Sequence, residues 1–176
     1  RPNDFKTQSL YGVGQDWPLA YEDLMEHYTF IEREWGTAGD NAFDQGGPRH
    51  GVPFPLPPVP MAYADQVIAK AIAPVGYTMG PFSHARNSVP FDDRPPCCGS
   101  ASCVPICPVG AKYDAAVHVA KAQAQGVQLL AESLIEHIEV GPDQLIRSVR
   151  IRRSNGERVV ARAKLYVLAA HAIETP

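Results

Sequence analysis

All four cysteines of the chain lie in one short segment, Cys97-Cys98-Gly-Ser-Ala-Ser-Cys103-Val-Pro-Ile-Cys107, which Pro108 follows. Single cysteines scattered through a protein usually behave as small buried hydrophobic residues. Four thiols in one loop rich in glycine and proline instead suggest a site that gathers sulfur around a bound group. The C-x3-C-P ending is typical of loops that hold iron–sulfur clusters. The spacing therefore favours metal–sulfur chemistry, with iron–sulfur first.

Two other uses of these thiols stay open. Zinc also binds four thiolates, although structural zinc sites usually combine two C-x2-4-C pairs on separate segments, and only one cysteine segment is present here. Disulfides are the other alternative. Cross-links within this segment would close very short loops, which stabilises little, and the adjacent Cys97 and Cys98 could bond to each other only with strain.

Several cationic or titratable side chains lie near the cysteines in sequence. His84, Arg86 and Arg94 precede the segment, where positive charge would offset the negative charge of a thiolate-bound cluster, although a solvated loop explains them equally well. His118 follows and is the one histidine of six that we consider for a supporting role. The chain contains no G-x-G-x-x-G after a strand, no P-loop, no G-x-S-x-G and no H-E-x-x-H.

Composition limits the other function classes. The 176 residues carry a net charge of −3 with a pI near 6.1, which gives no electrostatic footprint for nucleic acid. No apolar run approaches the ~20 residues that span a bilayer, and no signal-peptide pattern is found. The 17 prolines are about twice the average usage, which predicts long stretches without regular structure.

Three helices are expected before the C-terminal region. Apolar residues at helical spacing predict a helix over residues 18–35, with Asp16 as N-cap and Gly36 at its end. Residues 36–62 are rich in proline and glycine and predict an ordered loop or linker.

The other two helices are shorter. Asp65 is expected to cap a helix that Pro74 terminates, and Asp114 is expected to cap a helix that runs to Gly126.

The C-terminal third changes to β-structure. Residues 127–131 predict a short apolar strand. Alternating residues at 134–140, 145–152 and 158–163, separated by Gly141-Pro142-Asp143 and Ser154-Asn155-Gly156, predict a β-meander. Residues 164–170 read as a buried strand of the kind found in parallel sheets, whose neighbouring strands this chain does not supply. The expected fold class is an α+β fragment of a larger α/β fold.

Several segments together resemble one family, the glucose–methanol–choline (GMC) flavin oxidoreductases. Within it, the chain is similar to the large subunits of bacterial membrane-associated, FAD-dependent dehydrogenases of gluconate, sorbitol, fructose and glucose. The matching segments preserve their order along nearly the whole chain: Asp16-Trp-Pro-Leu-Ala-Tyr-Glu-Asp-Leu24, Ala85-Arg-Asn-Ser88, Asp93-Arg-Pro-Pro-Cys-Cys98, Cys107-Pro-Val-Gly-Ala-Lys-Tyr113 and Val167-Leu-Ala-Ala-His-Ala-Ile-Glu-Thr-Pro176.

The resemblance implies cofactors and their contacts. It implies that the cysteine loop carries a [3Fe-4S] cluster with Cys97, Cys103 and Cys107 as ligands and Cys98 as a spare or alternative ligand. It also implies that the strand around Ile135 and the later segment Ala169, Ala170 and His171 lie beside FAD, although His171 departs from the glycine or asparagine often found there.

The resemblance further implies a function. The parent enzyme would oxidise CH–OH groups of sugars or polyols and pass electrons from FAD through the cluster to a multihaem cytochrome c subunit. It would act in the periplasm with a small export subunit and be membrane-associated only through its partners. A non-catalytic binding module stabilised by zinc or disulfides is the alternative.

The resemblance also assigns the parts of the chain. Residues 1–84 would belong to a substrate or cap region, 85–113 to the cluster loop and 114–176 to the FAD-binding domain. The dinucleotide fingerprint would precede Arg1 and the catalytic histidine would follow Pro176. We therefore expect no catalytic residue in this chain, and we expect the isolated chain to bind no FAD tightly and to turn over no substrate.

Overall fold

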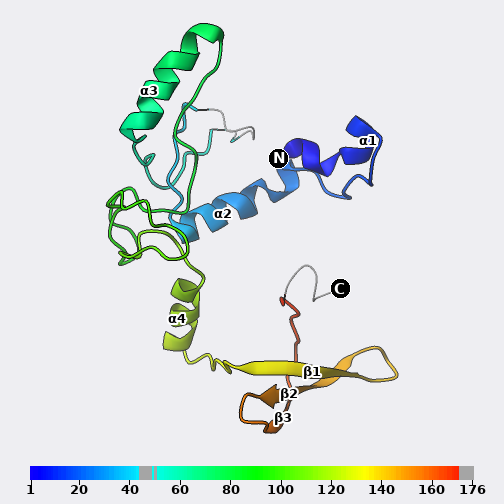
Figure 1. The fold of residues 1–176 in the computed structure, drawn as a ribbon. Coiled ribbons are helices and arrows are strands. Elements are labelled where there is room, and N and C mark those ends of the chain that lie inside the picture. The colour runs from blue at the N-terminus through cyan, green and yellow to red at the C-terminus, as the bar shows by residue number, and fades with distance from the viewer. Residues whose placement is uncertain (44–48, 50, 171–176) are drawn as a thin grey trace. The chain divides into compact units, whose positions relative to one another are not determined.

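The computed structural model describes residues 1–43, 49 and 51–170, and the chain divides into two compact units (Figure 1). Unit 1 comprises Arg1–Val117 and unit 2 comprises His118–Pro176. Unit 1 holds most of the helices and the cysteine segment, and unit 2 holds the sheet. Among the described residues, no helix is long and apolar enough to cross a membrane.

The N-terminal helices of unit 1 pack through aromatic side chains. Two short helices, η1 (Pro2–Phe5) and α1 (Thr7–Tyr11), precede a loop. Phe5 is buried, and its ring lies 5.3 Å from that of Trp17 and 6.0 Å from that of Tyr21. Asp16 accepts hydrogen bonds from the backbone N–H and the hydroxyl of Ser9. The expected N-cap role of Asp16 is therefore wrong, because its carboxylate is used to fix α1 to this loop.

The first long helix begins later than the sequence predicts. After η2 (Glu22–Leu24), α2 runs over Met25–Trp35. It ends where expected, since Gly36 adopts the left-handed conformation (φ 70°) that favours glycine at helix C-termini. Early residues of the predicted helix lie in a loop in which the Asp23 carboxylate accepts a hydrogen bond from the N–H of Ala20.

The small core of unit 1 is formed by residues far apart in sequence. Ala38 forms isolated β-bridges to Leu56 and to His84, so three segments meet at one residue. Ala38, Phe54 and Leu56 are buried there. The described part of the proline-rich stretch 36–62 is therefore a loop ordered by backbone hydrogen bonds, as predicted.

The next two helices agree with the sequence in their positions and differ in one cap. α3 covers Tyr63–Ile72 and ends before Pro74, which lies in η3 (Ala73–Val75). Asp65 lies inside the first turn of α3 and does not cap it, because Ala62 occupies the N-cap position.

The chain passes between the units in α4 (Ala116–Ala124). Asp114 behaves as expected at its start, because its Oδ1 accepts a hydrogen bond of 2.8 Å from the N–H of Ala116. After α4 the chain turns at Gly126, whose φ of 90° again requires the left-handed region.

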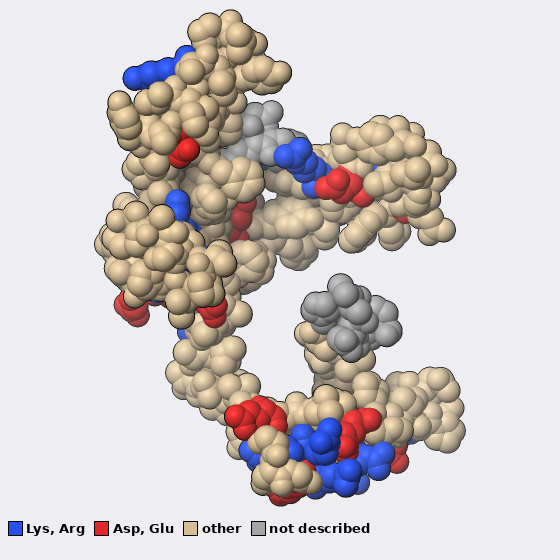
Figure 2. Space-filling view, viewed as in Figure 1, with Lys and Arg blue, Asp and Glu red and all other residues tan. Residues whose placement is uncertain are grey.

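Unit 2 contains the predicted β-meander. Strands β1 (Ser133–Val140), β2 (Ile146–Arg153) and β3 (Arg158–Ala161) form an antiparallel sheet in the order β1-β2-β3. Ile135 lies opposite Ile151, which is buried and lies opposite Val159. Arginines gather over this sheet (Figure 2), chiefly on β2 and β3. Glu136 balances two of them, with contacts of 2.8 Å to Arg152 and 3.0 Å to Arg158.

Two predicted strands are absent from unit 2. Residues 127–131 and 164–170 have no strand pairing, and the second segment exposes Leu165, Val167 and Leu168 by 78%, 77% and 51%. A strand exists only with a hydrogen-bonding neighbour, and neither segment has one in the described chain. Instead, the Tyr166 hydroxyl donates to the carbonyl of Arg147 at 2.9 Å and ties residues 164–170 to β2. Helices with one small antiparallel sheet make the chain α+β.

Candidate metal centre

The cysteine loop is closed at its base by Asn87. The backbone N–H of Asn87 donates to the carbonyl of Ala111 at 2.9 Å, and the carbonyl of Asn87 accepts from the N–H of Cys97 at 2.8 Å. One residue thus joins the beginning and the end of the loop. A second connection follows, from the N–H of Tyr113 to the carbonyl of Ala85 at 2.8 Å. The thiols therefore project from a loop whose two ends are fixed to the same segment.

The Asn87 side chain also orders the turn that precedes the cysteines. It is completely buried, and its Nδ2 donates to the carbonyls of Phe91 and Arg94 at 2.9 and 3.0 Å. Phe91 and Arg94 pair through both backbone hydrogen bonds around this turn. Asp92 and Asp93, between them, have positive φ values of 53° and 57°, so the turn depends on its surroundings for its geometry.

Arg94 supports the loop from beneath. It is only 9% exposed, its Nη2 donates to the carbonyl of Trp35 at 2.9 Å, and its guanidinium lies 5.7 Å from the centre of the Tyr113 ring. The rings of Trp35 and Tyr113 stack with centroids 5.2 Å apart. Arg94 therefore connects the end of α2 to the end of the cysteine loop, and its printed contacts lie with the backbone and a ring instead of with sulfur.

The four thiols are free and occupy different environments. Cys98 is exposed, whereas Cys97, Cys103 and Cys107 are partly buried. The Sγ of Cys97 accepts from the N–H of Gly99 at 3.4 Å, and the Sγ of Cys103 accepts from the Nη1 of Arg86 at 3.7 Å. Each of these donors favours a negatively charged sulfur, which is the form that binds metals. The three partly buried thiols are the three expected as ligands.

Cys107 has the strongest support for a thiolate. The backbone N–H of Lys112 hydrogen-bonds the sulfur and lowers the pKa of Cys107 below its usual value, against a smaller opposing effect of desolvation. The N–H groups of Val109, Ala111 and Gly110 lower this pKa further. The chain turns back over the sulfur because Gly110 has a φ of 70°, which glycine adopts without strain. Successive N–H groups aimed at one atom form an anion-binding concavity.

The donor chemistry of the loop fits a thiolate-bound metal or cluster. Three sulfurs have N–H donors, and the amide group around Cys107 suits a negatively charged ligand. The sulfurs are not gathered around one point, since the described residues include no group of three or more Cys, His, Asp or Glu side chains close enough to hold a metal ion. The contacts thus support the donor set and do not show a ligation geometry.

The residues expected to lie beside FAD all belong to unit 2. Ile135 lies on β1 with half of its surface exposed, and Ala169 and Ala170 are exposed in the unpaired segment after β3. His171 lies outside the described residues. Ile135 and the two alanines are therefore on different elements of the same unit, and their proposed roles stay predictions.

Sequence reasoning missed Asn87 and Lys112. Asn87 was noted only as part of the segment Ala85–Ser88, and Lys112 only as part of the segment that follows Cys107. In the structure Lys112 also donates from its Nζ to the carbonyl of Cys103 at 3.2 Å. No local pattern identifies either residue, because their partners lie elsewhere in the loop.

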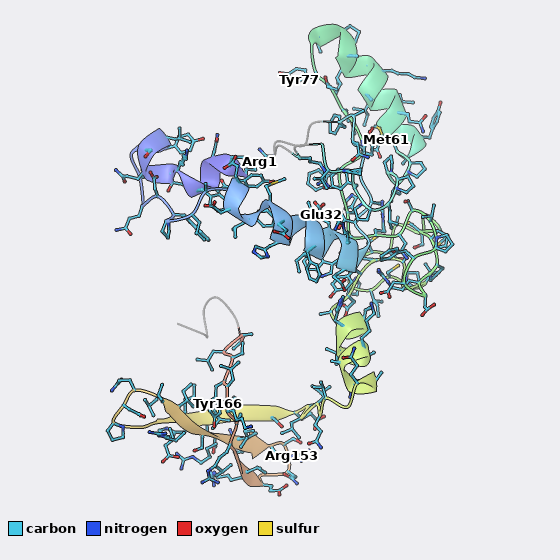
Figure 3. All side chains as sticks on the ribbon, turned by 180° about the vertical axis from the view of Figure 1, so that it is seen from behind. Arg1, Glu32, Met61, Tyr77, Arg153 and Tyr166 are labelled. Atoms are coloured by element: carbon cyan, nitrogen blue, oxygen red, sulfur yellow. The ribbon has the colours of Figure 1, made fainter. Side chains whose placement is uncertain are left out.

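Unit 1 also contains an open groove of about 700 Å³ beside α2. Its wall is largely aromatic and apolar, and one acidic residue, Glu32, is labelled in Figure 3. Glu32 is already engaged, because both of its carboxylate oxygens accept from Arg49, at 2.8 and 2.7 Å. Arg49 in turn stacks on the ring of Phe54 at 3.5 Å. The groove therefore offers apolar surface and no free carboxylate from Glu32.

Two known proteins are similar to this chain over essentially its full length. The fructose dehydrogenase large subunit of Gluconobacter japonicus is 34% identical over 177 residues, which are 99% of this chain and 32% of that protein. The 2-methyl-1,2-propanediol dehydrogenase of Mycolicibacterium austroafricanum is 25% identical over 179 residues, 100% of this chain and 32% of that protein. The chain spans about a third of the length of these relatives. No protein-family model matches it.

Proposed function

We propose that this chain is part of a dehydrogenase that oxidises a C–OH group of a sugar or polyol. The observation that carries the proposal is the 34% identity to a fructose dehydrogenase large subunit across 99% of the chain. The second relative is also named as a dehydrogenase, and both named substrates carry hydroxyl groups. An oxidoreductase role is the part of the proposal that both relatives support.

FAD is the proposed hydride acceptor, following the resemblance to the GMC flavin oxidoreductases. When bound, a flavin accepts hydride, and the protein supplies its position and electrostatic environment. We assign Ile135 on β1, Ala169, Ala170 and His171 to the FAD-binding part. The small side chains at 169 and 170 suit a place where backbone approaches a ligand closely.

A [3Fe-4S] cluster is the proposed group of the cysteine loop, with Cys97, Cys103 and Cys107 as its ligands. When bound, such a cluster transfers single electrons. The chain's own contribution is the set of N–H donors that favours thiolates at these positions, above all the amides that lower the pKa of Cys107. Cys98, which is exposed, is the spare or alternative ligand.

The proposed partners are an electron-accepting cytochrome c subunit and a small export subunit, at the periplasmic face of the membrane. The name of the first relative describes it as a large subunit, which supports a multi-subunit assembly.

The proposal is tested on protein purified without oxygen from a gene that includes any flanking coding sequence. We expect iron, acid-labile sulfide and FAD to copurify, and an artificial dye to be reduced with at least one of fructose, glucose, sorbitol or gluconate. Cys97→Ser, Cys103→Ser and Cys107→Ser should each lose iron, whereas the matched control Cys98→Ser should retain it. Zinc in place of iron would refute the cluster, and activity with nicotinamide cofactors alone would refute the flavin. The 176-residue chain by itself should retain no stoichiometric FAD after desalting.

A further inference from the structure

One cationic side chain in the described part of unit 1 contacts a thiol directly. The Nη1 of Arg86 lies 3.7 Å from the Sγ of Cys103, within hydrogen-bonding distance for sulfur. The Nε of the same guanidinium is buried without a hydrogen-bond partner. Leaving a buried donor of a charged group unpaired costs free energy, so a position of this kind requires compensation from its surroundings. A negatively charged sulfur site next to it would provide that compensation.

The backbone fixes Arg86 at this place. Arg86 forms an antiparallel bridge with Lys112, which itself hydrogen-bonds the sulfur of Cys107 through its N–H. Asn87, the next residue, closes the base of the cysteine loop. Arg86 is therefore attached to the same framework as the sulfurs and cannot move away from Cys103 without disturbing the loop.

The other cations near the loop have different partners. The Nζ of Lys112 donates to the backbone carbonyl of Cys103, and Arg94 is directed to the carbonyl of Trp35 and the ring of Tyr113. Burial, and then the charge of Arg86, lower the pKa of His84, so His84 adds no positive charge near neutral pH. Arg86 thus differs from these neighbours in placing its charge on a sulfur atom.

We propose that Arg86 is a positioning residue of the cysteine site. Its guanidinium orients Cys103, favours its thiolate and stabilises the negative charge added when one electron enters the bound cluster. Arginine suits this role because it stays protonated throughout the working pH range and presents several N–H donors in a fixed plane. The inference rests on the proposed iron–sulfur site and adds a residue that is not a ligand.

The experiment compares Arg86→Gln and Arg86→Lys with the matched control Arg33→Gln, which removes an exposed charge on α2. Each anaerobically purified protein is titrated with dithionite, which supplies the electron, and the cluster's midpoint potential is read from its electron paramagnetic resonance signal. We expect a lower potential for Arg86→Gln, because a positive charge that favours reduction is lost. Arg86→Lys should restore part of the shift, and Arg33→Gln should leave the potential unchanged.

A second readout does not depend on iron. In metal-free protein, the rate at which Cys103 reacts with a dicarboxylate-bearing aromatic disulfide is compared with its rate for an uncharged pyridyl disulfide, with mass spectrometry to identify the modified cysteine. Arg86 attracts the anionic reagent, so Arg86→Gln should reduce the ratio of the two rates roughly fivefold, the effect expected for a nearby unit charge in a solvated site. Arg86→Lys should preserve most of this ratio.

The outcomes separate the inference from the proposed function. If the wild-type protein contains no iron, the cluster proposal fails, and the reagent ratio still decides whether Arg86 acts on Cys103. If iron is present but Arg86→Gln leaves both the potential and the ratio equal to those of Arg33→Gln, the role of Arg86 is refuted. A Gln variant that loses its fold is recognised by circular dichroism, and the Lys variant then decides through the same two readouts.

Discussion

Replacing Asn87 with alanine tests whether this residue holds the cysteine loop together. Asn87 is fully buried, and its side chain donates two hydrogen bonds, to the carbonyls of Phe91 and Arg94. Alanine removes both donors and keeps the backbone hydrogen bonds to Cys97 and Ala111. The substitution therefore separates the contribution of the side chain from that of the main chain.

The expected loss can be worked out from these contacts. Each hydrogen bond contributes about 1 kcal/mol net, and the two carbonyls keep one partner each, because Phe91 and Arg94 also pair through their backbones. Removing a buried side chain adds the cost of a cavity. The Oδ1 of Asn87 is buried without a partner, so its removal relieves part of this cost. We expect a net destabilisation of about 2 kcal/mol.

Denaturation by urea, followed by tryptophan fluorescence, measures this quantity. Both tryptophans lie in unit 1, and Trp35 stacks on Tyr113 at the end of the cysteine loop, so the signal reports on this unit. Asn3→Ala is the matched control. Asn3 also donates from its side chain, to the hydroxyl of Tyr11 at 3.1 Å, but this hydrogen bond is exposed. The control should change the free energy of unfolding by less than about 0.5 kcal/mol.

Equal stability of Asn87→Ala and Asn3→Ala would refute the reasoning. It would mean that the buried amide contributes no more than an exposed one and that the loop is closed by its backbone alone. In the metal-loaded protein the variant should also lose iron faster to a chelator than the wild-type protein, because the positions of the thiols depend on the same clamp.

Three further predictions concern a glycine, a thiol and an ion pair. Gly36→Ala should destabilise unit 1 clearly more than Gly12→Ala in thermal unfolding, because both positions have positive φ but only the added Cβ at residue 36 would lie 2.5 Å from a phenylalanine ring. In metal-free protein, the pH midpoint for alkylation of Cys107, followed by mass spectrometry, should lie below that of the denatured chain, since backbone N–H groups lower its pKa; an equal midpoint would contradict this. Arg158 chiefly lowers the pKa of Glu136 below 4.5, so the stabilisation from this carboxylate should be present above that pH and be lost on acidification; in Arg158→Gln, nuclear magnetic resonance titration should show a higher pKa for Glu136.

Some of the fold follows from local sequence. The alternating residues of the meander and the turn residues between them correctly predicted three antiparallel strands. Asp114 and Gly36 correctly marked a helix start and a helix end. These features depend on residues within a few positions of one another, and short-range patterns are therefore sufficient to identify them.

Other features required the tertiary structure. Residues 127–131 and 164–170 have the composition of strands but lack partners, because pairing depends on segments far away in sequence. Asp16 has the residue type of an N-cap, yet the folded chain uses its carboxylate to bind Ser9.

The cysteine site divides in the same way. The sequence by itself determined which residues could bind a metal, because the type and spacing of the four thiols are local properties. The tertiary structure decided which cation meets a sulfur, which sulfur has a lowered pKa and which residue closes the loop. Arg86 and Arg94 are nearly equivalent in the sequence, but one contacts Cys103 and the other the carbonyl of Trp35. Side-chain direction is set by packing between distant segments, and a linear pattern carries no information about it.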